Sequence, residues 1–321
     1  MAAGGFYLEF EKPIVELEKK IREMKEFSSD GGLELSSEIV ALERKLEKLQ
    51  TEIFSKLTRW QRVQLARHPK RPYSLDYIQL IFTDWVELHG DRGYADDKAV
   101  VCGFAKLDNE KVLIVGQQKG RDTKQKLERN FGMMHPEGYR KALRLMKTAA
   151  RFGRPIIIFI DTPGAFPGVE AEERGQAEAI ARNILEMFRL EVPIIIAIIG
   201  EGASGGALGI GIGDRILMLE NSWYSVISPE GCAAILWRDQ TKAPDAAEAL
   251  RLTAADLMQI KVIDKILPEP TGGAHRNHQL AAQIVKAELL SCLAELKSLS
   301  TQELLARRLE KFRVIGIYDE V

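Results

Sequence analysis

The chain has 321 residues, of which 45% are hydrophobic and 28% are charged, and its formal net charge at pH 7 is −1. This length and composition are typical of a globular protein with one large domain, or with one domain and an appendage. The near-zero charge gives no electrostatic reason to expect nucleic acid or an anionic membrane as a partner, and no apolar run is long enough to span a membrane. The first residues lack a positive segment followed by an apolar one, so we expect no secretory signal.

The three cysteines, Cys102, Cys232 and Cys292, are isolated from one another, without a C-x-x-C pair. Isolated cysteines argue against a structural zinc site and fit a reducing compartment. We therefore expect no metal in this chain, and we expect Cys232 to be a small buried hydrophobic residue.

The first third of the chain carries a narrow apolar stripe between charged residues, a pattern that predicts a helical hairpin. Pro13 lies near the expected start of the first helix, and Ser36 or Ser37 is the expected cap of the second. We predict an arm over residues 1–70 and a main domain, with C-terminal helices, over residues 71–321. The arm either packs on its own domain or holds another subunit, and the sequence leaves both roles open. The stripe consists of Ile14, Leu17, Ile21, Met24, Leu35, Ile39, Leu42, Leu46, Leu49 and Ile53.

Between the arm and the main domain, Pro69 and Pro72 break the helical pattern. Beyond them, apolar residues at helical spacing predict one helix. Two β-rich segments, 99–107 and 111–117, are separated by a short polar turn and predict a β-hairpin. The apolar positions of the predicted helix are Ile78, Ile81, Phe82, Trp85 and Leu88.

The centre of the chain alternates between helices and strands, and one unit occurs twice. A helix is predicted from Pro136 to Phe152, followed by "RPIIIFIDTPGAFPG", a second helix and "VPIIIAIIGEGASGG". The two glycine-bearing segments lie 38 residues apart, and Gly164–Ala165 aligns with Gly202–Ala203. A strand, a glycine turn and a helix that recur in this way indicate stacked repeating layers.

The later part of the chain adds two short strands, "RILMLE" and "WYSVIS", and then helices. Ser228 is the expected cap and Pro229 the expected first residue of a helix. From about Ala281 onward the chain is predicted to be helical.

The stretch "GEGASGG", residues 200–206, fits two short motifs. As G-x-G-x-x-G it is a dinucleotide fingerprint, but glycines leave the helix that would follow unusually short for that fold. As G-x-S-x-G it is the nucleophile elbow of a serine hydrolase. Ser204 would be the nucleophile, and Asp264 and then His275 or His278 follow in the required order. Spacing alone does not exclude the hydrolase.

A third interpretation of the same stretch uses the backbone instead of side chains. Glycines after a strand leave N–H groups bare at the start of a helix, and without Cβ atoms a planar substrate can approach closely. Two such loops from adjacent layers make one pocket lined with donors, an oxyanion hole suited to charge on thioester enolates or ureas. In this interpretation Ser204 is merely small and needs no base.

Seven long segments, in order, resemble the α subunits of the carboxyltransferase component of bacterial-type, multi-subunit acetyl-CoA carboxylase. They cover most of the chain from about residue 7 to residue 316. Long ordered segments are far more specific than any short motif. The segments are "ARHPKRPYSLDYI", "GDRGYADDKAVVCGFAKL", "QKGRDTKQKLERNFGMMHPEGYRKALRLM", "FIDTPGAFPGVEAEERGQAEAIARN", "GEGASGGALGIGIGD", "YSVISPEGCAAILW" and "LPEPTGGAHRN".

The resemblance implies an α/β fold of the crotonase-like (ClpP/crotonase) class, a superhelix of stacked β-β-α layers with the helical arm added. It implies transfer of a carboxyl group from carboxybiotin, held on a separate biotin carboxyl carrier protein, to acetyl-CoA, giving malonyl-CoA for fatty acid synthesis. The other implied partners are biotin carboxylase and a β subunit with a zinc ribbon, in an α2β2 assembly in the cytoplasm or the plastid stroma. A carboxyltransferase for another acyl-CoA is the alternative within this fold.

By the family's pattern, the N–H groups of Gly205 and Gly206 hold the negative charge that develops on the ureido oxygen of biotin. The anionic biotin then takes the substrate proton, so no side-chain base is required. Gly164 and Ala165 are predicted to shape the pocket floor or to offer another amide. The chain has no M-K-M-like biotinylation site and no P-loop, so we expect it neither to carry biotin nor to use ATP.

Two cations in "GQQKGRDTKQK", Lys119 and Arg121, follow a predicted strand. They are candidate ligands for a carboxylate or a coenzyme A phosphate, because the guanidinium group offers a planar pair of donors. The alternative is a solvated, basic start of a helix.

Overall fold

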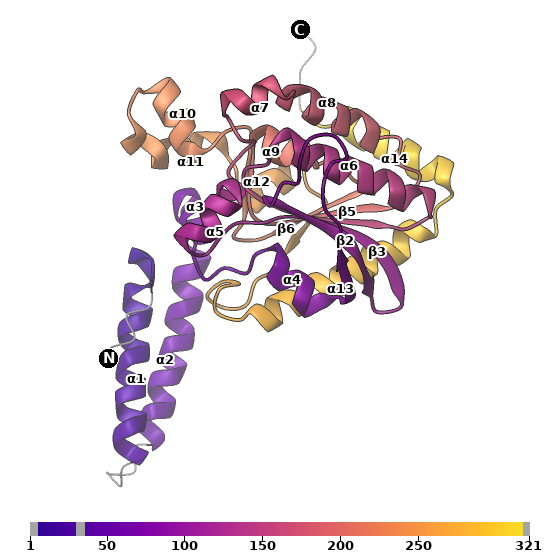
Figure 1. Ribbon diagram of the computed structural model, residues 1–321. Helices are drawn as coiled ribbons and strands as arrows, with labels where there is room; N and C mark the ends of the chain where they lie inside the picture. Colours follow the sequence, from indigo (N-terminus) through magenta and orange to yellow (C-terminus); the bar gives the residue numbers. More distant parts are fainter. Residues whose placement is uncertain (1–5, 30–35, 317–321) are drawn as a thin grey trace.

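Buried strands rich in β-branched residues form one mixed sheet at the centre of the molecule (Figure 1). The computed structural model describes residues 6–29 and 36–316. The strand order is β1-β2-β3-β4-β5-β6-β8, and β7 pairs with the last residues of β5. The first three strands are antiparallel neighbours, and the others run parallel. The strands are β1 (Thr83–Glu87), β2 (Val100–Leu107), β3 (Glu110–Gln117), β4 (Ile156–Thr162), β5 (Ile194–Ala203), β6 (Arg215–Leu219), β7 (Trp223–Ser225) and β8 (Lys265–Leu267).

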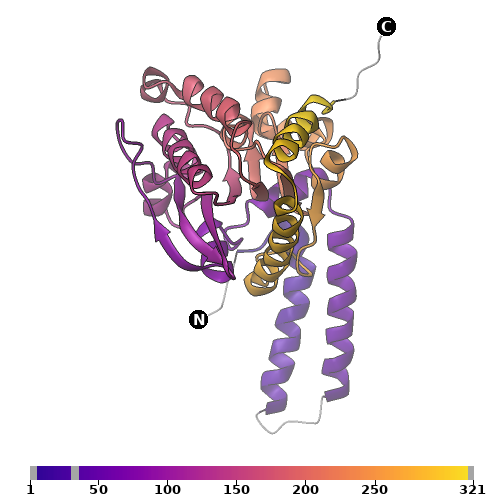
Figure 2. The same ribbon diagram turned by 90° about the vertical axis from the view of Figure 1, so that its right-hand side faces the viewer.

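Helices cover both faces of the sheet and enclose two apolar cores (Figures 1 and 2). One core lies between the sheet and the helices α6 (Pro136–Arg151) and α8 (Gln176–Met187), and the other lies beneath α4 (Ser74–Ile81) and α13 (His278–Lys297). The other helices of the described residues are α1 (Lys12–Ser29), α2 (Ser36–Ser55), α3 (Arg59–Ala66), α5 (Thr123–Glu128), α7 (Val169–Glu173), α9 (Ser204–Leu208), α10 (Pro229–Leu236), α11 (Ala243–Leu250), α12 (Ala254–Gln259) and α14 (Thr301–Arg313), with 3-10 turns η1 (Glu9–Glu11), η2 (Asn130–Gly132) and η3 (Gln240–Lys242).

The 38-residue repeat of the sequence corresponds to two neighbouring parallel strands. In the pairing of β4 with β5, Ile156 lies beside Ile194, and this offset of 38 residues continues to Ile160. Both strands are buried along their whole length, as parallel strands between two layers of helices are. After Ile160 the register shifts, and Thr162 lies beside Gly202. The two glycine-bearing segments therefore leave the sheet at different heights.

The N-terminal helices α1 and α2 form the predicted hairpin, which extends away from the sheet (Figures 1 and 2). They pack through the predicted stripe, in which Ile14 and Ile21 are buried and the other described members are half-buried. Leu35 lies outside the described residues, as does the side chain of Ser36, so the predicted cap of α2 stays untested.

Helix α3 lies on the arm side of the boundary predicted at residue 70, yet it packs on the main domain. Val63 and Ala66 share a small buried cluster with Ala203 and Trp223, at the end of β5 and in β7. The helix thus brings the chain from the arm to the carboxyl end of the central strands. The division of the chain at residue 70 stays a prediction.

The predicted single helix over residues 78–88 is wrong. Helix α4 ends at Ile81, and the chain continues as the edge strand β1, which pairs antiparallel with β2. Asp84 adopts a left-handed φ of 54°, which no continuous helix contains. The ring of Trp85 packs over Gly103 of β2, where the absence of a side chain leaves room for it. Pairing across the sheet therefore outweighs the local helical spacing of the apolar residues.

Most other predicted elements are confirmed. The predicted hairpin is formed by β2 and β3, which pair from Val100 beside Gln117 to Leu107 beside Glu110. The predicted helix after residue 136 is α6, and α13 provides the C-terminal helical segment. The hydroxyl of Ser228 accepts a hydrogen bond at the start of α10, as expected of its cap. All three cysteines are free and buried.

Candidate active site

Two glycine-bearing segments, here called the glycine loops, meet where β4 and β5 end. The first loop spans residues 162–168, and the second spans residues 200–206, which form the end of β5 and the start of α9. A Cβ atom on Gly206 would overlap the backbone of Gly164 and Ala165, so no other residue fits there without separating the loops. Because the register shifts after Ile160, the first loop faces Gly206, and the glycine alignment predicted from the repeat does not hold in space.

The second loop leaves two N–H groups bare where β5 gives way to α9. Ser204 turns the chain with a φ of 55°, and Gly205 and Gly206 follow in the first turn of α9. First-turn N–H groups have no acceptor within their own helix. In the part of the chain that the structure describes, neither N–H group has a protein acceptor. Gly205 borders open space, whereas Gly206 is buried against the first loop.

The first loop offers one further amide. The N–H group of Gly164 donates to Thr162 Oγ1 at 3.2 Å, so it already has a partner. Within the described residues, the N–H group of Ala165 has none. Of the two residues predicted to shape the pocket floor, Ala165 therefore has the available donor, and Gly164 provides the close contact with the second loop.

Gln117, the last residue of β3, holds both loops from the interior. Its side chain is fully buried, its Nε2 donates to the carbonyl oxygen of Gly206 at 2.7 Å, and its Oε1 accepts from the N–H group of Asp161 at 3.1 Å. A buried amide with both ends bonded fixes the groups it joins, because leaving either one unpaired costs about 1–3 kcal/mol. Gln117 thus ties α9 to the end of β4.

A hollow of about 700 Å³, here called the loop hollow, is bordered by residues of both glycine loops. It contains Gly164, Ala165 and Gly205, and Ile227 and Ser228 close its other side. Of the four predicted loop residues, Gly164, Ala165 and Gly205 border the loop hollow, and Gly206 is buried directly behind Gly205. The loop hollow is therefore the candidate active site.

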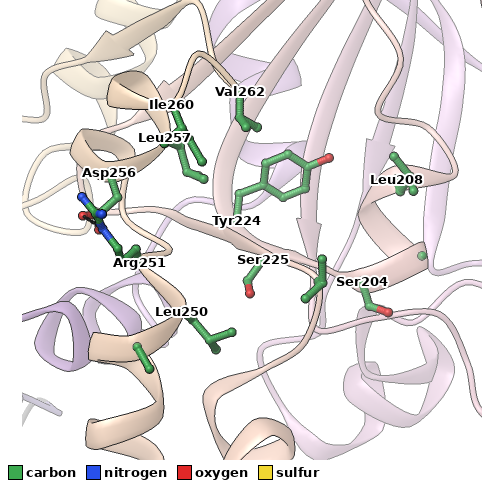
Figure 3. A pocket seen from close by; sticks show the side chains of 13 residues that line it. Ser204, Leu208, Tyr224, Ser225, Leu250, Arg251, Asp256, Leu257, Ile260 and Val262 are labelled. Carbon is green, nitrogen blue, oxygen red and sulfur yellow. Dashed lines mark ion pairs between the residues drawn. The ribbon is translucent and has the colours of Figure 1, made fainter. Parts of the chain in front are cut away.

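A second cavity, here called the apolar hollow, adjoins the loop hollow through Ser204 and Gly205 and has a volume of about 570 Å³ (Figure 3). Figure 3 shows the ring of Tyr224 in the middle of this cavity, with Leu257 beside it and Ser204 on the opposite side. Arg251 lies at its edge. Ser204 and Gly205, at the tip of the second loop, therefore border both cavities.

Lys119 and Arg121 already have carboxylate partners within the chain. Lys119 Nζ lies 2.6 Å from Asp161 Oδ1 and also pairs with Glu201. Arg121 pairs with Asp76. Both cations border a separate hollow of about 170 Å³, which contains none of the four predicted loop residues. The structure does not bring these cations into the loop hollow, and their contact with a substrate stays a prediction.

Two of the buried groups beside the second loop, Glu201 and Lys119, are held in their charged forms by their partners, whereas burial raises the pKa of Asp161. Burial alone would raise the pKa of Glu201, but attraction to Lys119 and Arg67 outweighs burial and holds that pKa below its ordinary value. Burial would lower the pKa of Lys119, but its two carboxylate partners raise it instead. Lys119 is therefore a permanent cation rather than a proton donor or acceptor.

The residues that a serine hydrolase would need are engaged away from Ser204. His275 Nε2 lies 3.1 Å from Glu11 Oε1 at the base of the arm, and His278 donates through Nε2 to a backbone carbonyl between α3 and α4. Asp264 pairs with a lysine of α14. The catalytic triad suggested by the sequence order is not assembled. The dinucleotide interpretation is also disfavoured, because α9 has five residues.

Within the described residues, one group of side chains has donor atoms close enough to share a metal ion: Glu11, His68 and His275, at the base of the arm. The two imidazole rings stack with centroids 4.0 Å apart. Hydrogen bonds already engage the group, since Glu11 Oε2 accepts from Leu8 N–H at 2.9 Å and His68 Nδ1 accepts from Lys70 N–H at 3.1 Å. We interpret the group as the link between arm and main domain; the expectation of a metal-free chain stays a prediction.

Solved structures that resemble this chain include a transcarboxylase and a malonate decarboxylase. The transcarboxylase 12S hexamer with bound methylmalonyl-coenzyme A matches 70% of this chain and 41% of its own, with a TM-score of 0.57 and 19% identity. A Pseudomonas malonate decarboxylase hetero-tetramer in complex with coenzyme A matches 66% of this chain and 85% of its own, with a TM-score of 0.54 and 19% identity. These likenesses show that the fold is crotonase-like.

The chain belongs to the acetyl-coenzyme A carboxylase carboxyltransferase α-subunit family. The family model described as "Acetyl co-enzyme A carboxylase carboxyltransferase-like" matches residues 7–316. The "acetyl-coenzyme A carboxylase carboxyl transferase subunit alpha" of Syntrophotalea carbinolica is 58% identical over 98% of this chain and 99% of its own length. The protein of the same description from Thermus thermophilus is also 58% identical, over 98% of this chain and 99% of its own. No helix of the described residues is long and apolar enough to cross a membrane.

Residues beside the site that were missed from the sequence include Gln117, Arg67 and Glu230. Gln117 ends a predicted strand, and a polar residue at the buried end of a parallel strand is a signal that could have found it. Arg67 and Glu230 are partners across 163 residues of sequence, and no local pattern reveals such a pair.

Proposed function

We propose that the chain is the α subunit of an acetyl-CoA carboxylase carboxyltransferase that carboxylates acetyl-CoA to malonyl-CoA together with a β subunit. The main observation is that two glycine loops meet in one hollow with amides that have no protein acceptor. Family membership over nearly the whole chain supports acetyl-CoA as the substrate. A biotin carboxyl carrier protein and a biotin carboxylase complete the proposed system, with an α2β2 carboxyltransferase in the cytoplasm or the plastid stroma.

The chain's residues fit a flat, uncharged ring that becomes anionic on one oxygen. Carboxybiotin, when bound, supplies the carboxyl group, and its ureido oxygen gains negative charge as that group leaves. The N–H groups of Gly205 and Gly206 would hold this oxygen, and the N–H group of Ala165 would offer a third donor. Each donor in such a site typically accounts for about 10²–10³ in rate, because fixed donors need no reorganisation as the charge develops.

The contribution of this chain is charge stabilisation and positioning rather than proton transfer. Within the described residues, no histidine, cysteine or lysine borders the loop hollow. The titratable side chains at its edge, Glu172 and Glu178, are exposed on the helical surface, and we assign them no step. Gln117 fixes the carbonyl group of Gly206, and we assign it the role of holding the start of α9 in place.

Reconstitution with the cognate β subunit tests the proposal. The complex is expected to consume malonyl-CoA in the presence of biotin or biotinylated carrier protein and to form acetyl-CoA, whereas either subunit alone is expected to be inactive. Matched reactions with methylmalonyl-CoA test the alternative within the fold, a carboxyltransferase for propionyl-CoA. If methylmalonyl-CoA is turned over faster than malonyl-CoA, the substrate that is carboxylated is propionyl-CoA rather than acetyl-CoA. Turnover by the α chain without biotin would reject the proposal.

A further inference from the structure

Five charged side chains form a continuous chain of ion pairs behind the loop hollow. We call Asp161, Lys119, Glu201, Arg67 and Glu230, in that spatial order, the ion chain. Lys119 Nζ lies 2.6 Å from Asp161 Oδ1 and also pairs with Glu201. Arg67 Nε donates to the other oxygen of Glu201 at 2.6 Å, and its two Nη atoms both bond Glu230, Nη2 at 3.2 Å. The ion chain thus links β4, β5 and α10 to the segments that directly follow β3 and α3.

Each carboxylate of the ion chain lies two or three residues from a segment that borders the loop hollow. Asp161 precedes Gly164 by three residues, Glu201 precedes Ser204 by three, and Glu230 follows Ser228 by two. These three segments contribute about half of the residues that border that cavity, and residues 172–180 contribute most of the others. The ion chain therefore links these three segments to one another.

Backbone contacts make the inner end of the ion chain tight. The N–H group of Glu201 donates to Asp161 Oδ1 at 3.0 Å, and a Cβ atom on Gly200 would collide with the same carboxylate. The stem of Lys119 packs against Gly132, whose φ of 82° suits glycine. A shift of either loop by about an ångström would break several of these bonds together, because hydrogen bonds are limited to narrow distances.

Stability alone does not explain so many buried charges. Lys119, Asp161 and Glu201 have side chains that are 12%, 3% and 7% exposed. Removing such groups from water costs about as much as their pairing returns, so apolar residues of similar size commonly stabilise a fold equally well. What paired charges provide in addition is a defined geometry, since each bond has one length and direction.

We propose that the ion chain positions the two glycine loops and the start of α10 around the loop hollow, and that Lys119 and Arg67 are positioning residues for carboxyl transfer. This inference rests on the proposed function, and it gives Lys119 a role different from direct binding of substrate. Lys119 acts through Asp161 and Glu201 on the loops and does not touch the reacting atoms.

The test compares variants of the α chain in complex with the cognate β subunit. Lys119→Met removes the central cation, and Lys311→Met is the matched control. Lys311 is also a lysine with little exposure, 15%, that pairs with one carboxylate, Asp264, but it lies on α14, near the opposite ends of the strands. We expect Lys119→Met to lower kcat about 10- to 100-fold with less than a threefold change in KM for malonyl-CoA, because misplacing a reacting group by about an ångström costs up to about 10² in rate.

Two further measurements separate positioning from general damage to the fold. Lys119→Arg is expected to recover activity to within about tenfold of the wild type, because a cation between the two carboxylates is restored. Hydrogen exchange of the peptides covering residues 162–168 and 200–206 is expected to accelerate in Lys119→Met and not in Lys311→Met. If Lys119→Met does not fold, Glu230→Gln replaces it, because Glu230 is less buried. This variant loses one ion pair, so we expect kcat to fall about 2- to 10-fold and hydrogen exchange at α10 to accelerate.

Two results would overturn the inference. A higher KM for malonyl-CoA with unchanged kcat in Lys119→Met would show that Lys119 binds substrate directly. A kcat and an exchange pattern equal to those of Lys311→Met would show that the ion chain has no part in positioning. Both outcomes require an active wild-type complex, whereas a wild-type complex without biotin-dependent turnover would contradict the proposed function itself.

Discussion

The contact between the two glycine loops predicts that adjacent glycines respond very differently to the same substitution. In Gly206→Ala the new Cβ would stand 2.3 Å from the carbonyl carbon of Gly164, where ordinary contact begins at 3.4 Å, so the loops would have to separate by about 1.1 Å. A displacement of this size at a reacting centre costs up to about 10² in rate, which corresponds to about 2.7 kcal/mol of transition-state stabilisation. We therefore expect Gly206→Ala to lower kcat by about 100-fold.

Gly205→Ala is the matched control for this prediction. Its Cβ would lie 3.4 Å from Ile180 Cδ1, an ordinary contact with a side chain that can adjust. Neither substitution removes an N–H group, and alanine favours the helical conformation of α9 over glycine. We expect Gly205→Ala to lower kcat less than tenfold.

The assay is the initial rate of biotin-dependent malonyl-CoA consumption by the complex with the β subunit. Circular dichroism and size-exclusion chromatography establish that each variant folds and assembles. Equal rates for Gly206→Ala and the wild type, with both properties retained, would refute the argument that close packing of the loops sets the geometry of the site.

Three further predictions concern the interior, the serine and the base of the arm. Gln117→Met leaves Gly206 O and Asp161 N–H unpaired. We therefore expect the free energy of unfolding, measured in urea, to fall by about 1–3 kcal/mol and kcat to fall as well. A variant with this loss of stability but an unchanged kcat would contradict the positioning role of Gln117. Ser204→Ala should retain activity within about threefold, because catalysis is assigned to backbone amides, and fluorophosphonate labelling of Ser204 that is lost in the variant would favour the hydrolase instead. Burial, aided by His275, lowers the pKa of His68 to about 4, whereas an unfolded histidine titrates near about 6.5, so the unfolded chain binds the proton first as the pH falls. Neutral His68 therefore stabilises the fold by up to about 3 kcal/mol above about pH 6.5, and this stabilisation is lost as the pH falls toward 4. The charged residues near it are Glu11, Lys70 and Arg276. Urea unfolding of His68→Asn should show a shallower loss over this range, and identical pH profiles would count against the assignment.

The layers of the fold were predictable because the strongest sequence signals are also the strongest structural constraints. The two isoleucine-rich segments can be buried on both faces only as parallel strands between helices, and their 38-residue offset is the register in which Ile156 meets Ile194. The cap at Ser228 was also local enough to be recognised. These features depend on residues within a few positions of one another or on an exact repeat.

Features that depend on distant partners could not be predicted. The stripe around Trp85 has helical spacing, but it forms an edge strand because β2 offers it a pairing surface. The sequence repeat aligns Gly164 with Gly202, but the structure does not place these two glycines side by side. The strands shift register after Ile160, and neither segment alone reveals that shift. Lys119 suggested a substrate ligand by its place after a strand, yet it is enclosed by carboxylates from two other strands.

The candidate site also combines features that the sequence predicts with features that it does not. The glycine loops and their sequence positions followed from the motif and from the family resemblance, and the structure places both loops at one cavity. Gln117 and the ion chain hold those loops in place through contacts between β3, α3 and α10 that span up to 163 residues. Backbone donors can thus be anticipated from glycines, whereas the side chains that orient them require the fold.

A crystal structure of the α chain in complex with its β subunit and biotin tests the central claim most directly. The account predicts the ureido oxygen in the loop hollow, about 2.7–3.1 Å from the backbone nitrogens of Gly205 and Gly206. A ureido oxygen held instead by a side chain such as Arg121, or one lying beyond hydrogen-bonding distance of both glycine amides, would contradict it.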